Sequence, residues 1–329
     1  MPSADPGTDQ TGGAGLRYDQ LHRLGAPGGW RLLLAVPMLV IGFLLAQVVF
    51  GVVVATLLRA GGASADDVAD KLSGDPATPS FLALIDLGWA AAIGLVLLVT
   101  WLIHSLAPGW ICSVVGRLRW RWMLVCAAIA VAALGVTLGV AAVLPDQGSG
   151  SITVGGPVND WTSATRDFVL VVVLLTPLQA AGEEFVFRGY LAQAFGGLLA
   201  RLRGYGGAAA AVVLPSVLFA LAHGLGQDLP IFFDRLAFGL VAGTLVLLTG
   251  GLEAGIAMHV LNNLFAFGLA LAFGDMTESL TPTDGTWWAI PVTLTQSMTY
   301  LLLTWWAARR LGVAARTDPA ILAGQRARV

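Results

Sequence analysis

The chain has 329 residues, of which 57% are hydrophobic and only 12% are charged, and its mean hydropathy is +0.78. A soluble domain carries about 25% charged residues, so this composition excludes an ordinary globular domain and indicates a membrane protein. The formal net charge of −2 argues against a nucleic-acid partner. The two cysteines, Cys112 and Cys126, argue against a disulfide framework and lack the spacing of a cysteine-based zinc site.

The chain in order predicts a series of membrane spans. The first 30 residues are polar and glycine-rich, and the apolar stretch that begins near Leu32 is too long for a secretory signal. Apolar stretches of about 20 residues follow one another along the chain. They predict eight spans, at about 33–58, 80–105, 122–144, 168–198, 207–226, 231–249, 253–272 and 287–308. We therefore expect an all-α, polytopic membrane protein with about eight transmembrane helices and a core of spans four to seven.

Basic residues are distributed unevenly between the two sides of these spans. Thirteen fall on the side of the termini and four on the other side. The larger set is Arg17, Arg23, Arg31, Arg117, Arg119, Arg121, Arg201, Arg203, Arg309, Arg310, Arg316, Arg326 and Arg328; the smaller is Arg59, Lys71, Arg166 and Arg235. Cytoplasmic loops carry an excess of Lys and Arg, so both termini are predicted to be cytoplasmic. The strong preference for arginine over lysine suggests a bacterium with a GC-rich genome, and hence its inner (plasma) membrane.

Three charged side chains interrupt the long fourth span. Glu183, Glu184 and Arg188 each cost roughly 2.5–3.5 kcal/mol at the centre of a spanning helix, so pairing, water or catalysis must offset them. Glu184 and Arg188 are i,i+4 neighbours, for which a salt bridge is natural. Glu183 is turned about 100° from Glu184. We therefore expect the two carboxylates to have different roles, and Glu183 to lack a partner at i±4.

Two further spans carry polar side chains at membrane depth. His223 lies on span five, and His259 and Asn263 are i,i+4 neighbours on span seven. Two imidazoles and a carboxylate can hold a divalent metal with an open position for water. They can equally hold a water directly, with Glu183 as general base and the histidines as acid and orienting groups. The amide of Asn263 suits an oxyanion, because it donates without titrating.

Structural explanations compete with these functional ones. Glu184 and Arg188 can form a buried ion pair that only locks helix packing, and a lone His223 or His259 is more often a packing hydrogen bond than a ligand. Together with Glu183 they favour a site.

Four other ionisable residues are predicted to lie outside any site. We expect Asp86 to face outer water and Glu253 to favour the N-terminus of span seven. His22 and His104 are expected to be solvated.

The motifs resemble those of one family. Glu183-Glu184-x-x-x-Arg188, Phe219-x-x-x-His223 and His259-x-x-x-Asn263 occur in this order on separate spans, within about residues 165–270. This pattern is similar to that of the CPBP family, which comprises the type II CAAX prenyl endopeptidases and the bacteriocin-processing and immunity proteins. The first 160 residues match only as generic spans.

The resemblance implies an intramembrane endopeptidase. Glu183 would activate water, His223 would help to hold that water or a metal, and His259 with Asn263 would stabilise the tetrahedral intermediate. Glu184 and Arg188 would support the site. A metalloprotease, with a divalent metal such as zinc on Glu183, His223 and His259, and a metal-free glutamate mechanism both fit the resemblance. The substrate would be a prenylated, leader-type or other membrane-associated peptide, presented from the bilayer or the cytoplasmic interface.

Composition and the predicted spans divide the chain, and the resemblance marks its core. We expect a polar cytoplasmic tail (1–30), three N-terminal spans (31–160), a catalytic core (161–275), a last span (276–310) and an arginine-rich cytoplasmic tail (311–329). A non-catalytic membrane scaffold or immunity protein is one alternative. An ion-coupled transporter is another, although the two halves lack the similar broken segments of inverted-repeat transporters.

Depth arithmetic raises one difficulty for this site. At 1.5 Å per residue, Glu183 lies about 22 Å along span four from its outer start at Phe168. His223 lies about 24 Å along span five from the inner start of that span, which places it near the outer side of the membrane. These depths differ by about half of a 30 Å bilayer core. We expect a tilted or broken fourth helix, with Pro177 as the kink, to reconcile them.

Overall fold

A computed structural model describes residues 15–145, 157–200, 205–224, 227–282 and 285–321. Within these residues every element of regular secondary structure is a helix. The first half contains a 3₁₀-helix η1 (Tyr18–Leu24), α1 (Trp30–Ala60), α2 (Ala65–Ser73), α3 (Pro79–His104), α4 (Gly109–Cys112) and α5 (Trp120–Ala141). The second half contains α6 (Ser163–Leu174), α7 (Thr176–Glu184), a π-helix η2 (Phe185–Leu191), α8 (Ala192–Leu198), α9 (Gly206–Ala222), α10 (Leu229–Thr249), α11 (Glu253–Phe273), α12 (Met276–Leu280) and α13 (Ala289–Arg310). The predicted all-α, polytopic class is confirmed.

Six of the described helical stretches are long and apolar enough to cross a membrane. They are α1, α3, α5, the continuous 36-residue stretch from α6 to α8, α10 and α11. The other two predicted spans correspond to α9, which is apolar but has 17 residues, and to α13, which has 22 residues and a more polar composition. The predicted eight therefore comprise six helices of full spanning character, one short helix and one less apolar helix.

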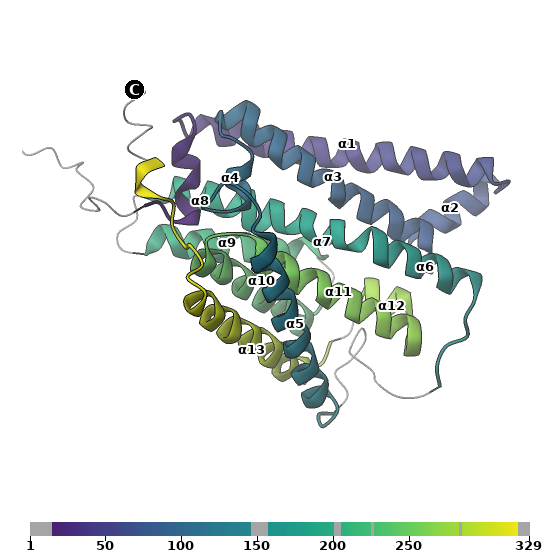
Figure 1. Ribbon diagram of the computed structural model, residues 1–329. Helices are drawn as coiled ribbons and strands as arrows, with labels where there is room; N and C mark the ends of the chain where they lie inside the picture. The colour runs from purple at the N-terminus through teal and green to yellow at the C-terminus, as the bar shows by residue number, and fades with distance from the viewer. Residues whose placement is uncertain (1–14, 146–156, 201–204, 225–226, 283–284, 322–329) are drawn as a thin grey trace, which may run out of the picture.

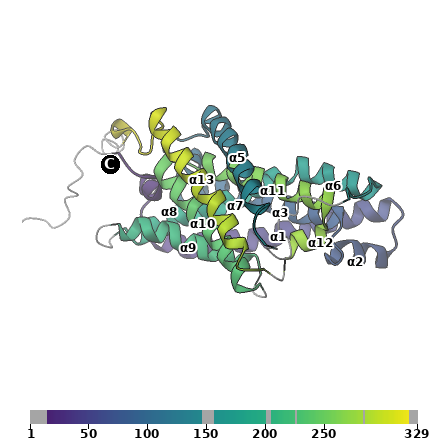
Figure 2. The same ribbon diagram turned by 90° about the horizontal axis from the view of Figure 1, so that it is seen from below.

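The helices form an elongated bundle with two distinct ends (Figure 1). One end holds η1, α8 and the C-terminal segment, and the opposite end holds α2, α6 and α12; the view from below in Figure 2 shows the same separation. α1 packs along α3 at the side of the bundle and leaves large apolar residues such as Leu33 and Val48 exposed. Such a surface suits contact with lipid.

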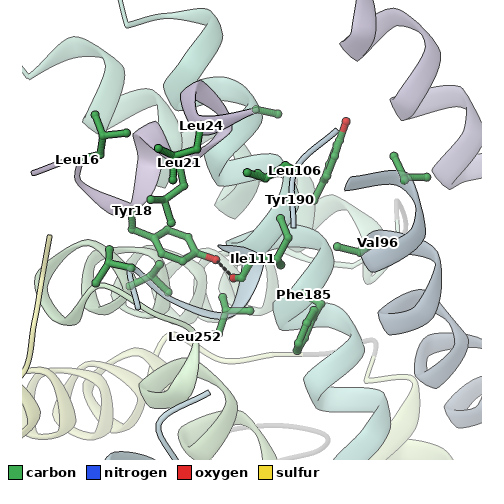
Figure 3. Close-up of a cluster of buried hydrophobic side chains, with 14 of the residues drawn as sticks. Leu16, Tyr18, Leu21, Leu24, Val96, Leu106, Ile111, Phe185, Tyr190 and Leu252 are labelled. Atoms are coloured by element: carbon green, nitrogen blue, oxygen red, sulfur yellow. Dashed lines mark hydrogen bonds between the residues drawn. The ribbon is translucent and has the colours of Figure 1, made fainter. Parts of the chain in front are cut away.

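Residues 16–24, predicted as part of a polar tail, are packed against the bundle. The side chains of Tyr18 and Leu21 are fully buried in the cluster shown in Figure 3, where the Tyr18 hydroxyl donates to the carbonyl of Ile111. The backbone amide of Leu16 donates to the Thr317 hydroxyl (2.9 Å), and the Thr317 amide donates back to the Leu16 carbonyl (2.9 Å). The first and the last described segments therefore meet at one end of the bundle.

The expectation that His22 and His104 are solvated is wrong. Their rings stack with centroids 4.4 Å apart, and Nε2 of His104 shares a hydrogen bond of 2.9 Å with the Tyr190 hydroxyl. Nε2 of His22 is buried and has no hydrogen-bond partner among the described residues. Burial, with a smaller contribution from His104, lowers the pKa of His22 from 6.5 to about 3. The sequence hides this pairing because the two residues lie on separate elements.

The half-buried His22 predicts an acid-sensitive contribution to stability. The unfolded chain binds a proton near pH 6.5, whereas the folded protein resists it until about pH 3, so stability falls as the pH drops through this window. His22→Phe keeps a stacking ring that does not titrate and should reduce this loss. Thermal unfolding in detergent at about pH 8 and about pH 4.5 measures it. An equal loss in both proteins would contradict the assignment to His22.

Asp86 and Glu253 also have partners that the sequence did not indicate. Asp86 is 2% exposed and accepts a hydrogen bond of 2.7 Å from the Thr176 hydroxyl, so the prediction that it faces water is wrong. Glu253 is fully buried, and both its oxygens accept from the Arg119 guanidinium, at 2.8 and 2.7 Å. The favourable position at a helix N-terminus is therefore only part of the explanation for Glu253. Its partner is 134 residues away in the sequence, beyond the reach of a local pattern.

Candidate active site

The fourth span changes its helical geometry beside the Glu-Glu pair. α7 ends at Glu184, and η2 continues the helix with i→i+5 geometry through Arg188. Short π-helical segments within α-helices occur frequently at functional sites. Two glycines bring neighbouring helices close to this segment: a Cβ on Gly182 would lie 2.0 Å from the Trp89 carbonyl oxygen, and one on Gly255 would lie 2.5 Å from Oε2 of Glu184. The glycines thus allow α3 and α11 to pack directly against α7.

A buried charge network joins η2 to α11. Nη1 of Arg188 donates to Oε1 of Glu184 at 2.8 Å, as the i,i+4 spacing predicts. The same oxygen lies 3.0 Å from Nδ1 of His259. The exposed fractions of these side chains are 1%, 0% and 5%. The guanidinium also lies over the Phe219 ring, 4.1 Å from its centroid, where a cation–π interaction is favourable.

Glu183 lies on the other edge of the same imidazole. Its Oε2 is 3.6 Å from Nε2 of His259, and its Oε1 accepts a hydrogen bond from the amide of Gln179. The Gln179 carbonyl oxygen accepts in turn from Nδ2 of Asn263 at 3.1 Å. A continuous polar chain therefore runs from Arg188 to Asn263.

This arrangement corrects the expectation that Glu183 lacks a partner at i±4. Its partner is Gln179, four residues earlier, whose side-chain amide donates to Glu183. The i,i+4 spacing carried that signal, but the partner is an uncharged amide and not the oppositely charged residue of an ion pair. The two carboxylates differ in orientation by their helical positions, yet both reach His259. They can do so because the ring presents its two nitrogens at different edges.

His223 lies apart from this network. It follows the last residue of α9, its Nδ1 lies 2.8 Å from the Phe219 carbonyl oxygen, and its side chain is exposed. The Phe219 ring contacts the rings of both His223 (4.5 Å) and His259 (5.9 Å). Phe238, which the sequence did not single out, lies 5.0 Å from His259. Aromatic rings therefore surround the two imidazoles.

The predicted metal ligands do not form a ligand set in this arrangement. In the part of the chain that the structure describes, no group of three or more His, Cys, Asp and Glu side chains is placed to hold a metal ion. Glu183 and His259 are close, but His223 binds its own helix backbone, and the Phe219 ring contacts both imidazoles. The donors present therefore do not fit a divalent metal as predicted.

A cavity of about 380 Å³ adjoins the network. Its wall includes four of the six predicted site residues, namely Glu183, His223, His259 and Asn263, whereas Glu184 and Arg188 are not part of the wall. Glu183 and His259 are only 4% exposed. The cavity therefore joins buried carboxylate and imidazole groups to a space large enough for part of a peptide.

The shared cavity also removes the depth difficulty. The fourth helical stretch begins at Ser163 and has 36 residues, which correspond to about 54 Å of helix. A stretch this long exceeds a bilayer core of about 30 Å, so distance from its start does not measure depth. Glu183 and His223 line the same cavity although their counted depths differ. The helix does change at Leu174–Thr176 and again at η2, as a broken span requires.

The segment that carries these residues matches a known protein family. Residues 165–265 match the family model described as type II CAAX prenyl endopeptidase Rce1-like. This match supports the assignment of the segment to the CPBP family of intramembrane proteases. All six predicted site residues lie within the match. No curated protein and no solved structure matches the chain.

Helices outside the CPBP domain complete the cavity wall. α3 contributes Asp86 and Trp89, and α13 contributes Thr293 and Gln296. The Gln296 amide donates to the Asn262 side chain at 2.8 Å, which ties α13 to α11. The cavity is therefore built by the CPBP domain together with flanking helices that the family comparison does not cover.

Proposed function

We propose that this protein is an intramembrane endopeptidase that hydrolyses membrane-associated peptides with water activated by Glu183. The observation that carries the proposal is the pairing of Glu183 with His259 at 3.6 Å on the cavity wall, with the other imidazole nitrogen held by Glu184. Membership of the Rce1-like domain in a protease family supports the reaction class.

The buried ion pair sets the protonation pattern of His259. The Glu184 carboxylate accepts a charge-assisted hydrogen bond from the Arg188 guanidinium at 2.8 Å. An ionised Glu184 accepts the Nδ1–H of His259, so Nε2 is the nitrogen that faces Glu183 and the cavity. This tautomer is assigned from the hydrogen-bond network. His259 can then exchange a proton at Nε2 while Glu184 stabilises its charged form.

Glu183 is suited to act as the general base. Its Oε1 is held by Gln179, whereas its Oε2 accepts no hydrogen bond from the described residues and can accept one from a water. Two polar atoms 3.6 Å apart are too distant for a direct bond but can both contact one water. Glu183 would remove a proton from this water as its oxygen forms a bond to the scissile carbonyl carbon.

The remaining groups suit the tetrahedral intermediate and its breakdown. Asn263 uses one N–H on Gln179 and has a second that can donate to the developing oxyanion. When the C–N bond breaks, Glu183 would return the proton to the leaving amine, which leaves the carboxylate ionised for another cycle. We assign His223, which is exposed on the cavity wall, to orienting the bound peptide.

The same proposal places the protein in the plasma membrane with both termini in the cytoplasm. The described basic residues support this orientation, because Arg31, Arg121, Arg309 and Arg310 lie at the helix ends on the side of the termini.

Two linked measurements test the proposed function. Proteomics of new N-termini in cells that express the wild-type or the Glu183→Gln protein should nominate substrates, because only the wild-type protein should generate them. Cleavage of a nominated peptide is then followed with purified protein in proteoliposomes. A complete absence of new termini and of cleavage by the wild-type protein would end the peptidase proposal.

The arrangement of the donors predicts that hydrolysis does not require a metal. Since no described group of three ligand side chains comes together, extraction with a chelator should leave the cleavage rate unchanged, and elemental analysis should find no stoichiometric metal. Loss of activity with chelator that zinc restores would overturn the metal-free mechanism and reinstate the predicted ligands Glu183, His223 and His259.

A further inference from the structure

The end of the bundle that holds η1 and the last described residues is closed beneath the proposed active site. A fully buried cluster that includes Tyr18, Ile111, Tyr190 and Leu252 fills this end, and Figure 3 shows these side chains together around the η1 helix. The Tyr300 hydroxyl adds a hydrogen bond of 2.8 Å to the Ala254 carbonyl in the first turn of α11. Packing of this density leaves no route for a peptide.

An ion pair reinforces the closed end. The fully buried Glu253 accepts three hydrogen bonds from Arg119, two from the guanidinium and one from the backbone amide. Arg119 also donates to the carbonyl oxygens of Thr249 and Ala314, so it ties α5, α10 and the C-terminal segment together at the start of α11. Opening this end would break all of these contacts at once.

The cavity extends toward the opposite end of the bundle. His259 is six residues from the first residue of α11, or about 9 Å, whereas about 21 Å of the helix lies beyond it. The part of the cavity wall farthest from the closed end is formed by the ends of several helices. These are the first turns of α3, α10 and α13, the last turn of α9, and α12 with the residues that follow it. The wall residues there are Phe81, Leu82, Ala222, His223, Pro230, Ile231, Ser279, Thr281, Gly285 and Ala289. His223 and Thr281 are exposed, so the cavity reaches the surface here.

Charge distinguishes these two ends of the bundle. The closed end carries Arg31 at the start of α1, Arg121 at the start of α5, and Arg309 and Arg310 at the end of α13. The open end carries Arg59, Lys71 and Arg166 together with a larger acidic set, which comprises Asp66, Asp67, Asp70, Asp160, Asp228, Asp275 and Glu278. Basic residues concentrate on the cytoplasmic side of membrane proteins. The closed end therefore faces the cytoplasm.

We propose that the cavity admits its substrate from the extracytoplasmic face. The substrate class is then a membrane-anchored polypeptide whose cleaved segment lies at the outer interface of the membrane. This orientation departs from the expectation of a peptide presented from the cytoplasmic side. The assignment of a substrate rests on the proposed hydrolysis, whereas the direction in which the cavity opens does not.

The chemistry of the outer wall suits an extended polypeptide. Asn262 and Gln296 present a bonded pair of amides, and Asp234 accepts from both Thr293 and Arg235. Nε of Arg235 has no partner among the described residues, so the guanidinium retains a donor. Amide and guanidinium donors beside carboxylate acceptors can bind the N–H and C=O groups of a peptide backbone without requiring a particular side chain.

Cysteine accessibility tests the direction of opening. In a background where Cys112 and Cys126 are replaced by alanine, single cysteines are introduced by Thr281→Cys at the open end, Ala266→Cys on the cavity wall and Ala314→Cys near the closed end. A membrane-impermeant maleimide is applied to intact spheroplasts and again after permeabilisation. Thr281→Cys and Ala266→Cys should react before permeabilisation, and Ala314→Cys only afterwards.

The outcomes separate orientation from catalysis. Reaction of Ala314→Cys in intact spheroplasts, with Thr281→Cys protected, would overturn the proposal by reversing the orientation. Reaction of Thr281→Cys but not Ala266→Cys would show that the cavity does not open at this face. Labelling requires no hydrolysis, so a correctly oriented protein that cleaves no peptide would refute the proposed function and leave the direction of opening standing. In an active protein, the reagent added outside should abolish cleavage by Ala266→Cys while wild-type cleavage continues.

Discussion

Glu183→Gln should lower the rate of peptide-bond hydrolysis by about 10²- to 10⁴-fold, the usual contribution of a positioned general base. The amide that replaces the carboxylate has nearly the same size and can still contact Gln179 and His259, but it cannot take a proton from water. The side chain is 4% exposed on the cavity wall, so bulk solvent offers no replacement base in the same position. The measurement is the initial rate at which a nominated substrate acquires its new N-terminus in proteoliposomes.

A matched change elsewhere separates chemistry from damage to the fold. Glu278→Gln removes the same charge from an exposed position on α12 and should leave the cleavage rate within experimental error. Both variants should insert into the membrane and unfold at wild-type temperatures. Full activity of Glu183→Gln would end the assignment of this residue as the base, and equal loss in both variants would point to a general effect of charge.

Local spacing accounts for the parts of the site that the sequence predicted. The i,i+4 spacing predicted the Glu184–Arg188 ion pair. The free-energy cost of charged side chains inside a membrane indicated that this segment belongs to a site. Hydropathy placed the spans because every backbone polar group in lipid must be satisfied within a helix, which fixes helix length against bilayer thickness. These two constraints act within one helix, so one sequence is enough to apply them.

Contacts between helices account for the parts that the sequence did not predict. The pairing of Glu253 with Arg119 and the stacking of His22 on His104 join residues that no local period connects. The position of His223 depends on the Phe219 ring, which contacts it and His259 alike. The motif residues alone suggested that Glu183, His223 and His259 form one set of metal ligands. Sequence spacing indicates that these side chains face the same interior, but it does not show where bulky side chains such as Phe219 lie between them.

The closed end of the bundle also depends on contacts between elements that are distant in the sequence. Tyr18 and Leu21 belong to a segment that is polar on average, and averages over a window conceal two apolar residues that face inward on one turn of helix. Their burial against α4 and α8 depends on contacts between elements that are far apart in the sequence. The difference in charge between the two sides of the membrane, in contrast, is visible in the sequence. The side from which a substrate enters follows only when this difference is combined with the position of the cavity.

Arg188→Met should destabilise the protein by about 3–5 kcal/mol, since it leaves the buried Glu184 carboxylate without its charge partner. The change also removes the guanidinium from the face of Phe219, a contact worth about 0.5–2 kcal/mol. Reversible unfolding in mixed micelles measures the loss. Arg166→Met is the control: it breaks an ion pair whose side chains are 61% and 46% exposed, and such changes usually stay within about 0.5 kcal/mol.

The double variant Glu184→Gln/Arg188→Met distinguishes support of the fold from support of catalysis. Removal of both charges leaves no unpaired ion in the interior, so most of the stability lost in Arg188→Met should return, less the contribution of the Phe219 contact. Cleavage should stay low, because a neutral amide no longer stabilises the charged form of His259 through Nδ1. A double variant that regained both stability and full activity would show that Glu184 and Arg188 serve only helix packing. The proton exchange at Nε2 of His259 would then depend on Glu183 alone.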